Sequence, residues 1–549
     1  MSQCLDMLSI LTLVLLCGFA HGLFRVDPLV NTKGGLIRGL RSENGYAMFL
    51  GIPYAVVNKD NPFGPSAPHQ GFDDVFDAYE SNICPQLRNG VPAGTLDCLT
   101  LNVYVPSAAT TKTPFPVMVW IHGGGFIGGS SSRDSGPDFL LRNDVIVVAI
   151  NYRVGAYGFM CLDMPEVSGN QGLKDQVLGL RWIKENIEAF GGDANQITVF
   201  GESAGGMSIN LHLLSNYESL FHRAIIQSGP AVSPWVSRDV NNTIPLSLAE
   251  ALEYNAESVA DAIDYLSTID PHTLVKTAAE LKLTETDEAD NPLTLPCIET
   301  YTEGVEHFMT QHPKNIKSDK VAKTPIIIGH NNNEMPFEYA LQKDEFFDNY
   351  DFTYLLNQEF EFGEDLEDAL KDIRHFYIGD EKASVYLKDL ITDFASDFVF
   401  NHPTQRMAER FLELGAKTVY RYIFSYSGGR NLLKWAYNLD VQGAVHADEL
   451  GYLFDMVMLK GDITPEDQLM IDRLTTLWTN FAKYGNPTPE TSDLLPEKWL
   501  PITKTTQPFL DMDAHVTMGA RPFREAMAFW DVFYKLHRKQ HKYYQDPEE

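Results

Sequence analysis

Short, continuous apolar runs recur along the chain and alternate with segments whose apolar residues have helical spacing. Apolar runs of this length predict strands that are buried on both faces of a sheet. They lie at 114–121, 144–150, 197–200, 224–229, 325–329 and 418–424, and weaker strand patterns lie at 35–39, 46–53 and 99–105. A helix is predicted over 174–188 from its apolar residues Val177, Leu180, Trp182, Ile183 and Ile187. Alternating strands and helices predict an α/β fold with a mostly parallel central sheet flanked by helices.

Two long segments, 240–320 and 340–400, differ from this alternation because they are acidic and rich in helical patterns. We expect them to be insertions that cover the carboxyl edge of the sheet, where open α/β sheets bind their ligands. The sequence contains no low-complexity linker and no internal repeat. Residues 23–549 are therefore predicted to form a single domain.

An uninterrupted apolar run occupies 7–20 and is too short to span a membrane comfortably. Ala20-His21-Gly22 places small residues at the −3 and −1 positions of a cleavage site, so residues 1–22 are predicted to be a signal peptide. An uncleaved anchor is the alternative. No second hydrophobic span follows. We expect a secreted, extracellular protein without stable membrane insertion.

The 549 residues carry a formal net charge of −31. Nucleic acids and anionic membrane surfaces bind basic patches, so neither is an expected partner. The sequon Asn241-Asn242-Thr243 predicts a glycan on Asn241. The protein is expected to be a monomer or a weak dimer.

Of the six cysteines, two lie in the predicted signal peptide and four follow it. Secretion permits disulfides, and Cys84 and Cys98 are predicted to close a short loop. Cys161 and Cys297 have apolar neighbours that predict burial, so we expect free core thiols there, with a bond between them as the alternative. No C-x-x-C or H-E-x-x-H pattern is present, and no metal or other cofactor is expected.

The candidate chemistry is centred on Gln196–Gly206, which is Q-I-T-V-F-G-E-S-A-G-G. A buried strand, then G-x-S-x-G, then a helical pattern is the arrangement of a nucleophile elbow, in which a tight, strained turn exposes the serine hydroxyl. Glycines at 201 and 205 would let strand and helix pack closely enough for this turn. The pentapeptide alone is also compatible with an ordinary Gly/Ser turn, but its context predicts Ser203 as a nucleophile.

A second glycine run, His122-Gly123-Gly124-Gly125-Phe126, follows the buried strand that ends at Ile121. Glycines at this position let backbone N–H groups point into a site without obstruction by side chains. The predicted oxyanion-hole donors are the N–H groups of Gly124, Gly125 and Ala204. A flexible loop or a phosphate cradle are the alternatives, but no Lys-Ser/Thr pair follows as a P-loop requires.

A serine needs a base, and the base needs an orienting acid, in the chain order Ser, acid, His for an α/β-hydrolase. Glu334 follows the predicted strand at 325–329, and His446 lies in a loop of small residues after the strand at 418–424. Taken alone, each has an ordinary alternative, a solvated loop glutamate and a structural histidine. Together with Ser203 they predict a Ser-Glu-His triad.

With these residues assembled, the chain resembles the type-B carboxylesterase/cholinesterase family across nearly the whole mature sequence. The motifs that carry the resemblance are F-L-G-I-P-Y-A (49–55), D-C-L-T-L-N-V-Y-V-P (97–106), V-W-I-H-G-G-G-F (119–126), N-Q-G-L-K-D-Q (170–176), G-E-S-A-G-G (201–206) and G-A-V-H-A-D-E-L (443–450). The resemblance implies the α/β-hydrolase fold, the triad named above, an acyl-pocket aromatic at Trp235, and polar neighbours of the triad at Glu202 and Ser228. In its sequence features as a whole, the chain looks most like secreted insect carboxylesterases.

Several positions depart from the family pattern. Leu96 and Pro62 stand where the family has an ion pair, so we expect that place to be apolar. Tyr254 and Tyr265 stand where a second family disulfide would be. Met335 replaces the glycine that usually follows the catalytic glutamate, which puts the geometry of the acid loop in question.

The Cys84–Cys98 loop contains no aromatic residue to hold a quaternary ammonium group, so choline esters are poor candidate substrates. Juvenile-hormone-type esterases typically have Gln at the position of Glu202, which argues against that branch. The predicted function is a secreted serine carboxylesterase that hydrolyses apolar, small-molecule esters through an acyl-enzyme on Ser203. A catalytically silent binding or adhesion protein of the same fold is the alternative. An interfacial lipase would need an exposed apolar lid, which the acidic insertions do not obviously offer.

Overall fold

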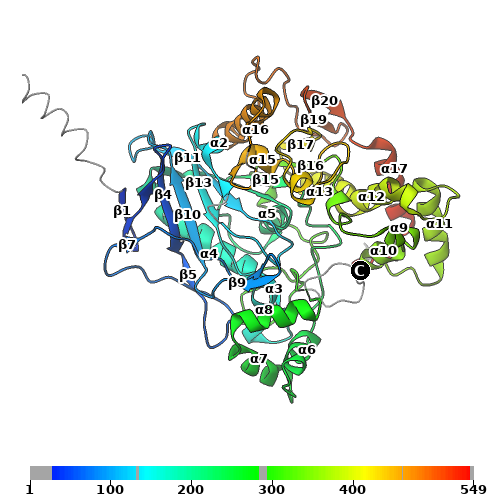
Figure 1. Cartoon of the computed structure of the whole chain (residues 1–549), viewed down its shortest axis with the longest axis horizontal. Coiled ribbons are helices and arrows are strands. Elements are labelled where there is room, and N and C mark those ends of the chain that lie inside the picture. Colours follow the sequence, from blue (N-terminus) through cyan, green and yellow to red (C-terminus); the bar gives the residue numbers. More distant parts are fainter. Residues whose placement is uncertain (1–27, 132–134, 284–293, 460, 545–549) are drawn as a thin grey trace, which may run out of the picture.

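The computed structural model describes residues 28–131, 135–283, 294–459 and 461–544. The predicted signal peptide lies outside the described residues, and the single-domain boundary remains a prediction. An eleven-stranded sheet forms the centre of the molecule (Figure 1). Its strands, in spatial order, are β20 (Thr517–Ala520), β19 (Pro508–Met512), β17 (Val419–Phe424), β16 (Ile326–Asn331), β15 (Arg223–Gln227), β14 (Gly192–Glu202), β11 (Phe115–Ile121), β13 (Ile146–Ile150), β10 (Thr100–Val105), β4 (Ala47–Pro53) and β3 (Leu40–Arg41).

The strands from β13 through β19 run parallel, and antiparallel strands close both edges. Smaller sheets pair β1 (Leu29–Thr32), β2 (Gly35–Arg38) and β7 (Phe76–Asp77), β5 (Ala55–Val56) with β6 (Ala67–Pro68), β8 (Gln86–Arg88) with β9 (Val91–Ala93), and β12 (Ser135–Gly136) with β18 (Asp455–Met456). The predicted fold class, a mostly parallel α/β sheet flanked by helices, is confirmed.

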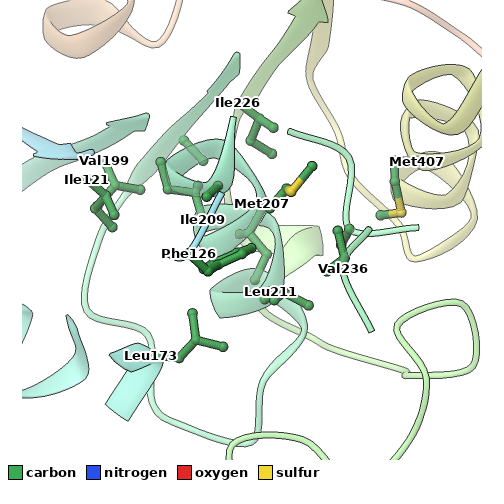
Figure 2. Close-up of a cluster of buried hydrophobic side chains, with 14 of the residues drawn as sticks. Ile121, Phe126, Leu173, Val199, Met207, Ile209, Leu211, Ile226, Val236 and Met407 are labelled. Atoms are coloured by element: carbon green, nitrogen blue, oxygen red, sulfur yellow. The ribbon is translucent and has the colours of Figure 1, made fainter. Parts of the chain in front are cut away.

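Helices cover both faces of the sheet. On one face lie α4 (Gln171–Asn186), α5 (Ala204–Leu214), α12 (Lys388–Ser396), α13 (His402–Glu413) and α17 (Arg524–Leu536); on the other lie α2 (Asp138–Leu141), α15 (Leu450–Leu453) and α16 (Pro465–Tyr484). Successive strand residues alternate between the two cores: Val119 belongs to the first and Met118 to the second. Figure 2 shows part of the first core, to which Ile209 and Leu211 of α5 and Val199 of β14 all belong.

The two acidic insertions form helical groups at separate places around the sheet (Figure 1). The first contains α6 (Thr243–Ala251), α7 (Val259–Ser267) and α8 (Pro271–Glu280), which pack beside α3 (Gly155–Phe159). The second contains α9 (Asp344–Asp348), α10 (Thr353–Glu359), α11 (Leu366–Tyr377) and α12, followed by a π-helix over Asp397–Asn401; the short α14 (Leu432–Tyr437) comes later in the chain. Within the described ranges, no helix has the length and apolar character needed to cross a membrane.

The register of the parallel strands places their carboxyl ends at one edge. Ile121 lies beside Gly201, Glu202 beside Gln227, and Gln227 beside Gly329. The residues that follow these strand ends therefore converge at this edge of the sheet.

The prediction of free thiols at Cys161 and Cys297 is wrong. The structure joins them in a disulfide, with the two Cα atoms 6.5 Å apart, although 136 positions separate them in sequence. Both side chains are buried, as their neighbours predict, but burial is equally compatible with a thiol and with a disulfide. Cys161 and Cys297 meet because the chain between them folds so that the two residues become neighbours. The predicted bond between Cys84 and Cys98 is present.

Two of the departures from the family pattern have a structural account. The rings of Tyr254 and Tyr265 stack, with centroids 4.0 Å apart, in the place expected for a disulfide. Leu96 packs against apolar clusters, as an apolar replacement of an ion pair requires. The neighbouring Phe63 is fully buried and stacks on Tyr157.

Candidate active site

Ser203 lies at the turn between β14 and α5, as a nucleophile elbow requires. Its backbone has φ 57° and ψ −126°, a conformation that a serine rarely adopts, and its N–H donates to the carbonyl oxygen of Gln227 at 2.9 Å. A Cβ at Gly205 would come within 2.0 Å of the carbonyl oxygen of Ile121, so only glycine permits this approach of helix and strand. This close packing of helix and strand fixes the position of the Ser203 backbone and therefore of its Cβ atom.

The glycine run lies directly beside the elbow. A Cβ at Gly123 would come 3.1 Å from the Cβ of Ser203, and Gly124 has φ +110°, which favours glycine. Gly124, Gly125 and Ala204, the three predicted oxyanion-hole residues, line the same cavity as Ser203. The structure therefore brings together the glycine run and the elbow, which are far apart in sequence.

The His446 side chain contacts carboxylates through both ring nitrogens. Its Nδ1 lies 2.6 Å from Oε2 of Glu334, and its Nε2 lies 3.0 Å from Oε1 of Glu202. The second contact is close enough for an ion pair, but its angles do not meet those of a hydrogen bond. The other oxygen of Glu334, Oε1, accepts hydrogen bonds from Ser228 Oγ and from the backbone N–H of Asn331, each at 2.7 Å. Glu334 is thus held from one side while it holds His446 from the other.

Burial and charge act in opposite directions on these groups. Burial by itself lowers the pKa of His446, but the carboxylates of Glu202 and Glu334 raise it above its ordinary value. Burial raises the pKa of Glu202 more than the charge of His446 lowers it, and the carboxylates of Glu449 and Glu334 raise it further. For Glu334, the effects of His446 and Ser228 exceed that of burial, so its pKa is lowered. The neighbouring carboxylates therefore stabilise the imidazolium, the form that a neutral histidine takes once it has removed a proton from serine.

A cavity of about 720 Å³ contains Ser203, His446 and the glycine run. Most of its other walls are apolar: Trp120, Phe126, Ile127, Met207, Trp235, Leu295, Phe337, Leu432, Leu433, Leu450, Phe454 and Met456. Such a cavity is large enough for a small ligand and offers few groups that could bind a charged one.

Aromatic rings surround His446. Phe337 stacks on the imidazole with centroids 4.8 Å apart, and Phe400, from the π-helix, lies 4.8 Å away at a tilt. Trp235, the predicted acyl-pocket aromatic, packs edge-on against Phe400 at 5.8 Å. Phe337 and Phe400 shield the imidazole from water, and Phe337 and Trp235 line the cavity beside it.

Met335 does not displace the acid loop. Its side chain is fully buried, its N–H donates to Ser396 Oγ at 3.1 Å, and Glu334 still reaches His446. At the predicted glycosylation site, Asn241 Oδ1 accepts hydrogen bonds from Thr243, and Thr243 is exposed. Glycosylation remains a prediction.

Sequence reasoning did not identify Phe337, Phe400 or Asn331 as parts of the site. Phe337 is three residues after Glu334, so it lies in a segment that the sequence had already singled out. Phe400 had no local signal, because it reaches His446 only through the packing of the second insertion.

Comparison with known proteins agrees with this geometry. A family model described as the carboxylesterase family matches residues 26–530. The chain belongs to the carboxylesterase family. It is accordingly a carboxylic ester hydrolase with the α/β-hydrolase fold.

Relatives cover most of this carboxylesterase. It is 32% identical to juvenile hormone esterase of Tribolium castaneum, over 84% of both chains, and 30% identical to liver carboxylesterase of Sus scrofa, over 92% of both. Among solved structures, juvenile hormone esterase of Manduca sexta, described with OTFP covalently attached, superimposes with a TM-score of 0.79 at 26% identity. That match covers 93% of this chain and 100% of the other. A PNB esterase gives a TM-score of 0.73 at 28% identity, covering 92% and 100%.

Proposed function

We propose that this carboxylesterase hydrolyses esters through an acyl-enzyme on Ser203, with His446 as general base and then general acid and Glu334 as its orienting carboxylate. The observation that carries the proposal is the convergence of the strained serine, the Glu334–His446 pair and the glycine run on one cavity. These groups come from four segments, and no single structural role explains all of them.

In the first step, His446 removes the proton of Ser203 while the serine oxygen attacks the ester carbonyl. The two neighbouring carboxylates stabilise the imidazolium that results. The N–H groups of Gly124, Gly125 and Ala204 stabilise the negative oxygen of the tetrahedral intermediate, and loss of one such donor costs about 10²–10³-fold in rate. His446 then protonates the departing alcohol, and water activated by the same imidazole releases the acid.

The proposed substrates are small, apolar esters, because the cavity walls beyond the triad are mainly aliphatic and aromatic. Trp235, which lines the cavity, would contact the acyl group. Juvenile hormone is a test substrate, because relatives carry that name, but Glu202 stands where that branch typically has Gln. We also propose that the protein is secreted, as its N-terminal pattern and its two disulfides support.

The test is hydrolysis of p-nitrophenyl esters from acetate to decanoate by purified wild-type protein and by Ser203→Ala, with acetylthiocholine and juvenile hormone as further substrates. We expect turnover of short and medium esters, a loss of at least about 10³-fold in Ser203→Ala, and weak activity on acetylthiocholine. Wild-type protein that is no faster than Ser203→Ala would favour the silent binding protein instead.

A further inference from the structure

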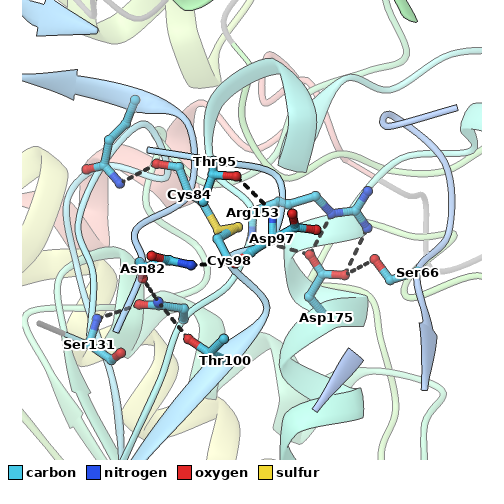
Figure 3. Close-up of a disulfide and its surroundings, with 12 residues drawn as sticks. Ser66, Asn82, Cys84, Thr95, Asp97, Cys98, Thr100, Ser131, Arg153 and Asp175 are labelled. Atoms are coloured by element: carbon cyan, nitrogen blue, oxygen red, sulfur yellow. Dashed lines mark hydrogen bonds and ion pairs between the residues drawn. A yellow bond between two sulfur atoms is a disulfide. The ribbon is translucent and has the colours of Figure 1, made fainter. Parts of the chain in front are cut away.

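The disulfide between Cys84 and Cys98 closes a loop of the chain (Figure 3). Gln86 lies in this loop, at the start of β8. Its side chain is buried, and its amide makes two hydrogen bonds to one residue of the glycine loop. Oε1 accepts from the backbone N–H of Gly129 at 2.8 Å, and Nε2 donates to the backbone carbonyl of Gly129 at 2.9 Å. A side-chain amide that satisfies both polar groups of one peptide residue fixes its orientation as well as its position.

Gly129 lies on the returning arm of the loop that presents the proposed oxyanion-hole donors. The N–H groups of Ile127 and Gly128 both donate to the carbonyl oxygen of Gly124 at 3.0 Å, so the loop closes on itself. A Cβ at Gly129 would come 2.3 Å from the carbonyl oxygen of Gly123. The returning arm is therefore in direct contact with the arm that carries Gly124.

The base of the loop is fastened to the sheet by other groups. The hydroxyl of Tyr152 donates to the carbonyl oxygen of His122 at 2.8 Å. Past the loop, the N–H of Ser131 donates to Asn151 Oδ1 at 2.6 Å, and its carbonyl oxygen accepts from Asn102 at 2.5 Å. Gln86 binds Gly129, which lies between these two attachment points, where the loop returns toward Gly124 and Gly125.

We propose that Gln86 is a positioning residue for ester hydrolysis: by pairing with Gly129 it holds the glycine loop in the shape that aims the Gly124 and Gly125 N–H groups at the oxyanion. This inference rests on the proposed function. The Cys84–Cys98 disulfide contributes to this positioning: Cys98 lies two residues before β10 begins at Thr100, so the bond ties the segment of Gln86 to the central sheet.

The decisive variant is Gln86→Met, which preserves the length of the side chain and removes both hydrogen bonds to Gly129, together with the one that Nε2 donates to the carbonyl oxygen of Cys84 at 3.1 Å. The N–H and carbonyl of Gly129 then lack these partners, and the loop is free to shift. A displacement of about 1 Å at a reacting group can cost about 10²-fold in rate. We expect kcat for p-nitrophenyl butyrate to fall about 10- to 100-fold with KM changed less than about 2-fold, because the donors act in the transition state.

Gln405→Met is the matched control. Gln405 is also a buried glutamine, and its amide donates to Asp531 on the remote contact of α13 with α17. Gln405→Met makes the same chemical change as Gln86→Met and should cause a similar general loss of stability. Gln405, however, does not contact the glycine loop. The kcat and KM of Gln405→Met are expected to stay within about 2-fold of the wild-type values.

A trifluoromethyl ketone supplies a second readout. The serine hydroxyl adds to its carbonyl carbon, the proton passes to the imidazole, and the carbonyl oxygen becomes an oxyanion that needs the same donors. We expect its inhibition constant to rise in Gln86→Met by about the factor by which kcat falls, and to stay unchanged in Gln405→Met.

Gln86→Glu adds a pH signature. An ionised glutamate accepts from the N–H of Gly129 but repels its carbonyl oxygen, whereas a protonated glutamate regains a donor. We therefore expect the ratio of kcat in Gln86→Glu to kcat in the wild type to increase as the pH falls. This ratio also serves if Gln86→Met fails to fold.

The outcomes separate the two proposals. If Ser203→Ala abolishes activity but Gln86→Met matches Gln405→Met in kcat and in ketone affinity, ester hydrolysis stands and the role of Gln86 is refuted. A pH-independent ratio for Gln86→Glu, or failure of both Gln86 variants to fold, also refutes it by leaving Gln86 a structural residue. If wild type is no faster than Ser203→Ala, both proposals fail.

Discussion

Replacement of Glu334 by Gln tests the triad most sharply, because the structure determines how the new amide must lie. Oε1 of Glu334 accepts from Ser228 Oγ and from the N–H of Asn331, while Oε2 faces Nδ1 of His446 at 2.6 Å. An amide has one accepting oxygen, and the two donors require it on their side. The NH₂ group of the introduced glutamine would therefore face His446.

In the Glu334→Gln variant, the imidazole of His446 is held in a tautomer that cannot act as a base toward Ser203. To accept a hydrogen bond from the amide, Nδ1 of His446 must lose its proton, so the neutral ring carries its proton on Nε2 and cannot remove one from Ser203. Such a change of tautomer costs about 10⁴-fold in kcat in a serine protease triad, which corresponds to about 5 kcal/mol of activation free energy. We expect a loss of this size in Glu334→Gln.

The assay is steady-state hydrolysis of p-nitrophenyl butyrate, with circular dichroism and thermal unfolding to check that the variant is folded. Ser228→Ala is the comparison variant. It removes one donor to Oε1, but the Asn331 N–H still orients the glutamate, so its loss should be below about 10-fold. A folded Glu334→Gln that keeps more than one tenth of wild-type kcat would refute the assignment of Glu334 as the group that sets the tautomer.

Three further predictions concern neighbouring features. Glu202→Gln removes a carboxylate that raises the pKa of His446, so the acidic limb of the kcat/KM profile should move to lower pH by about 1–3 units; an unmoved limb would contradict the contact. Replacing Cys161 and Cys297 together by Ser opens a loop with a sequence separation of 136 and should reduce the free energy of unfolding by about 5 kcal/mol, as measured by urea denaturation; recovery of both as free thiols in non-reducing peptide maps would exclude the bond. Trp235→Ala removes a cavity wall and should raise kcat/KM for p-nitrophenyl decanoate relative to acetate by about 10-fold, whereas an unchanged ratio would place the acyl chain elsewhere.

Most elements of the fold were accessible from local sequence patterns. The predicted strand at 418–424 is β17, and the helix predicted over 174–188 is α4 followed by a 3-10 turn. Strands buried on both faces carry continuous apolar runs, which is a local signal. The edge strand β20 was not predicted, because its four residues, Thr517–Ala520, are partly exposed and have no apolar run.

The chemical groups were also largely accessible from sequence, because each depends on residue type and on its nearest neighbours. The backbone conformations of Ser203 and Gly124 require particular residue types nearby, so a short segment of sequence is enough to indicate them. The order Ser203, Glu334, His446 identified the acid and the base as candidates, and the fold then brought His446 to 2.6 Å from Glu334.

Only the tertiary structure decided which groups meet. The bond between Cys161 and Cys297, the contact of Phe400 with His446, and the grip of Gln86 on Gly129 each join segments that are distant in sequence. No local pattern encodes these pairs, because each distance is set by the packing of whole helices and strands between the partners. The sequence by itself determined the class of chemistry, through residues whose backbone and order are distinctive. The cavity shape, the charges around the imidazole and the support of the glycine loop arise from long-range packing.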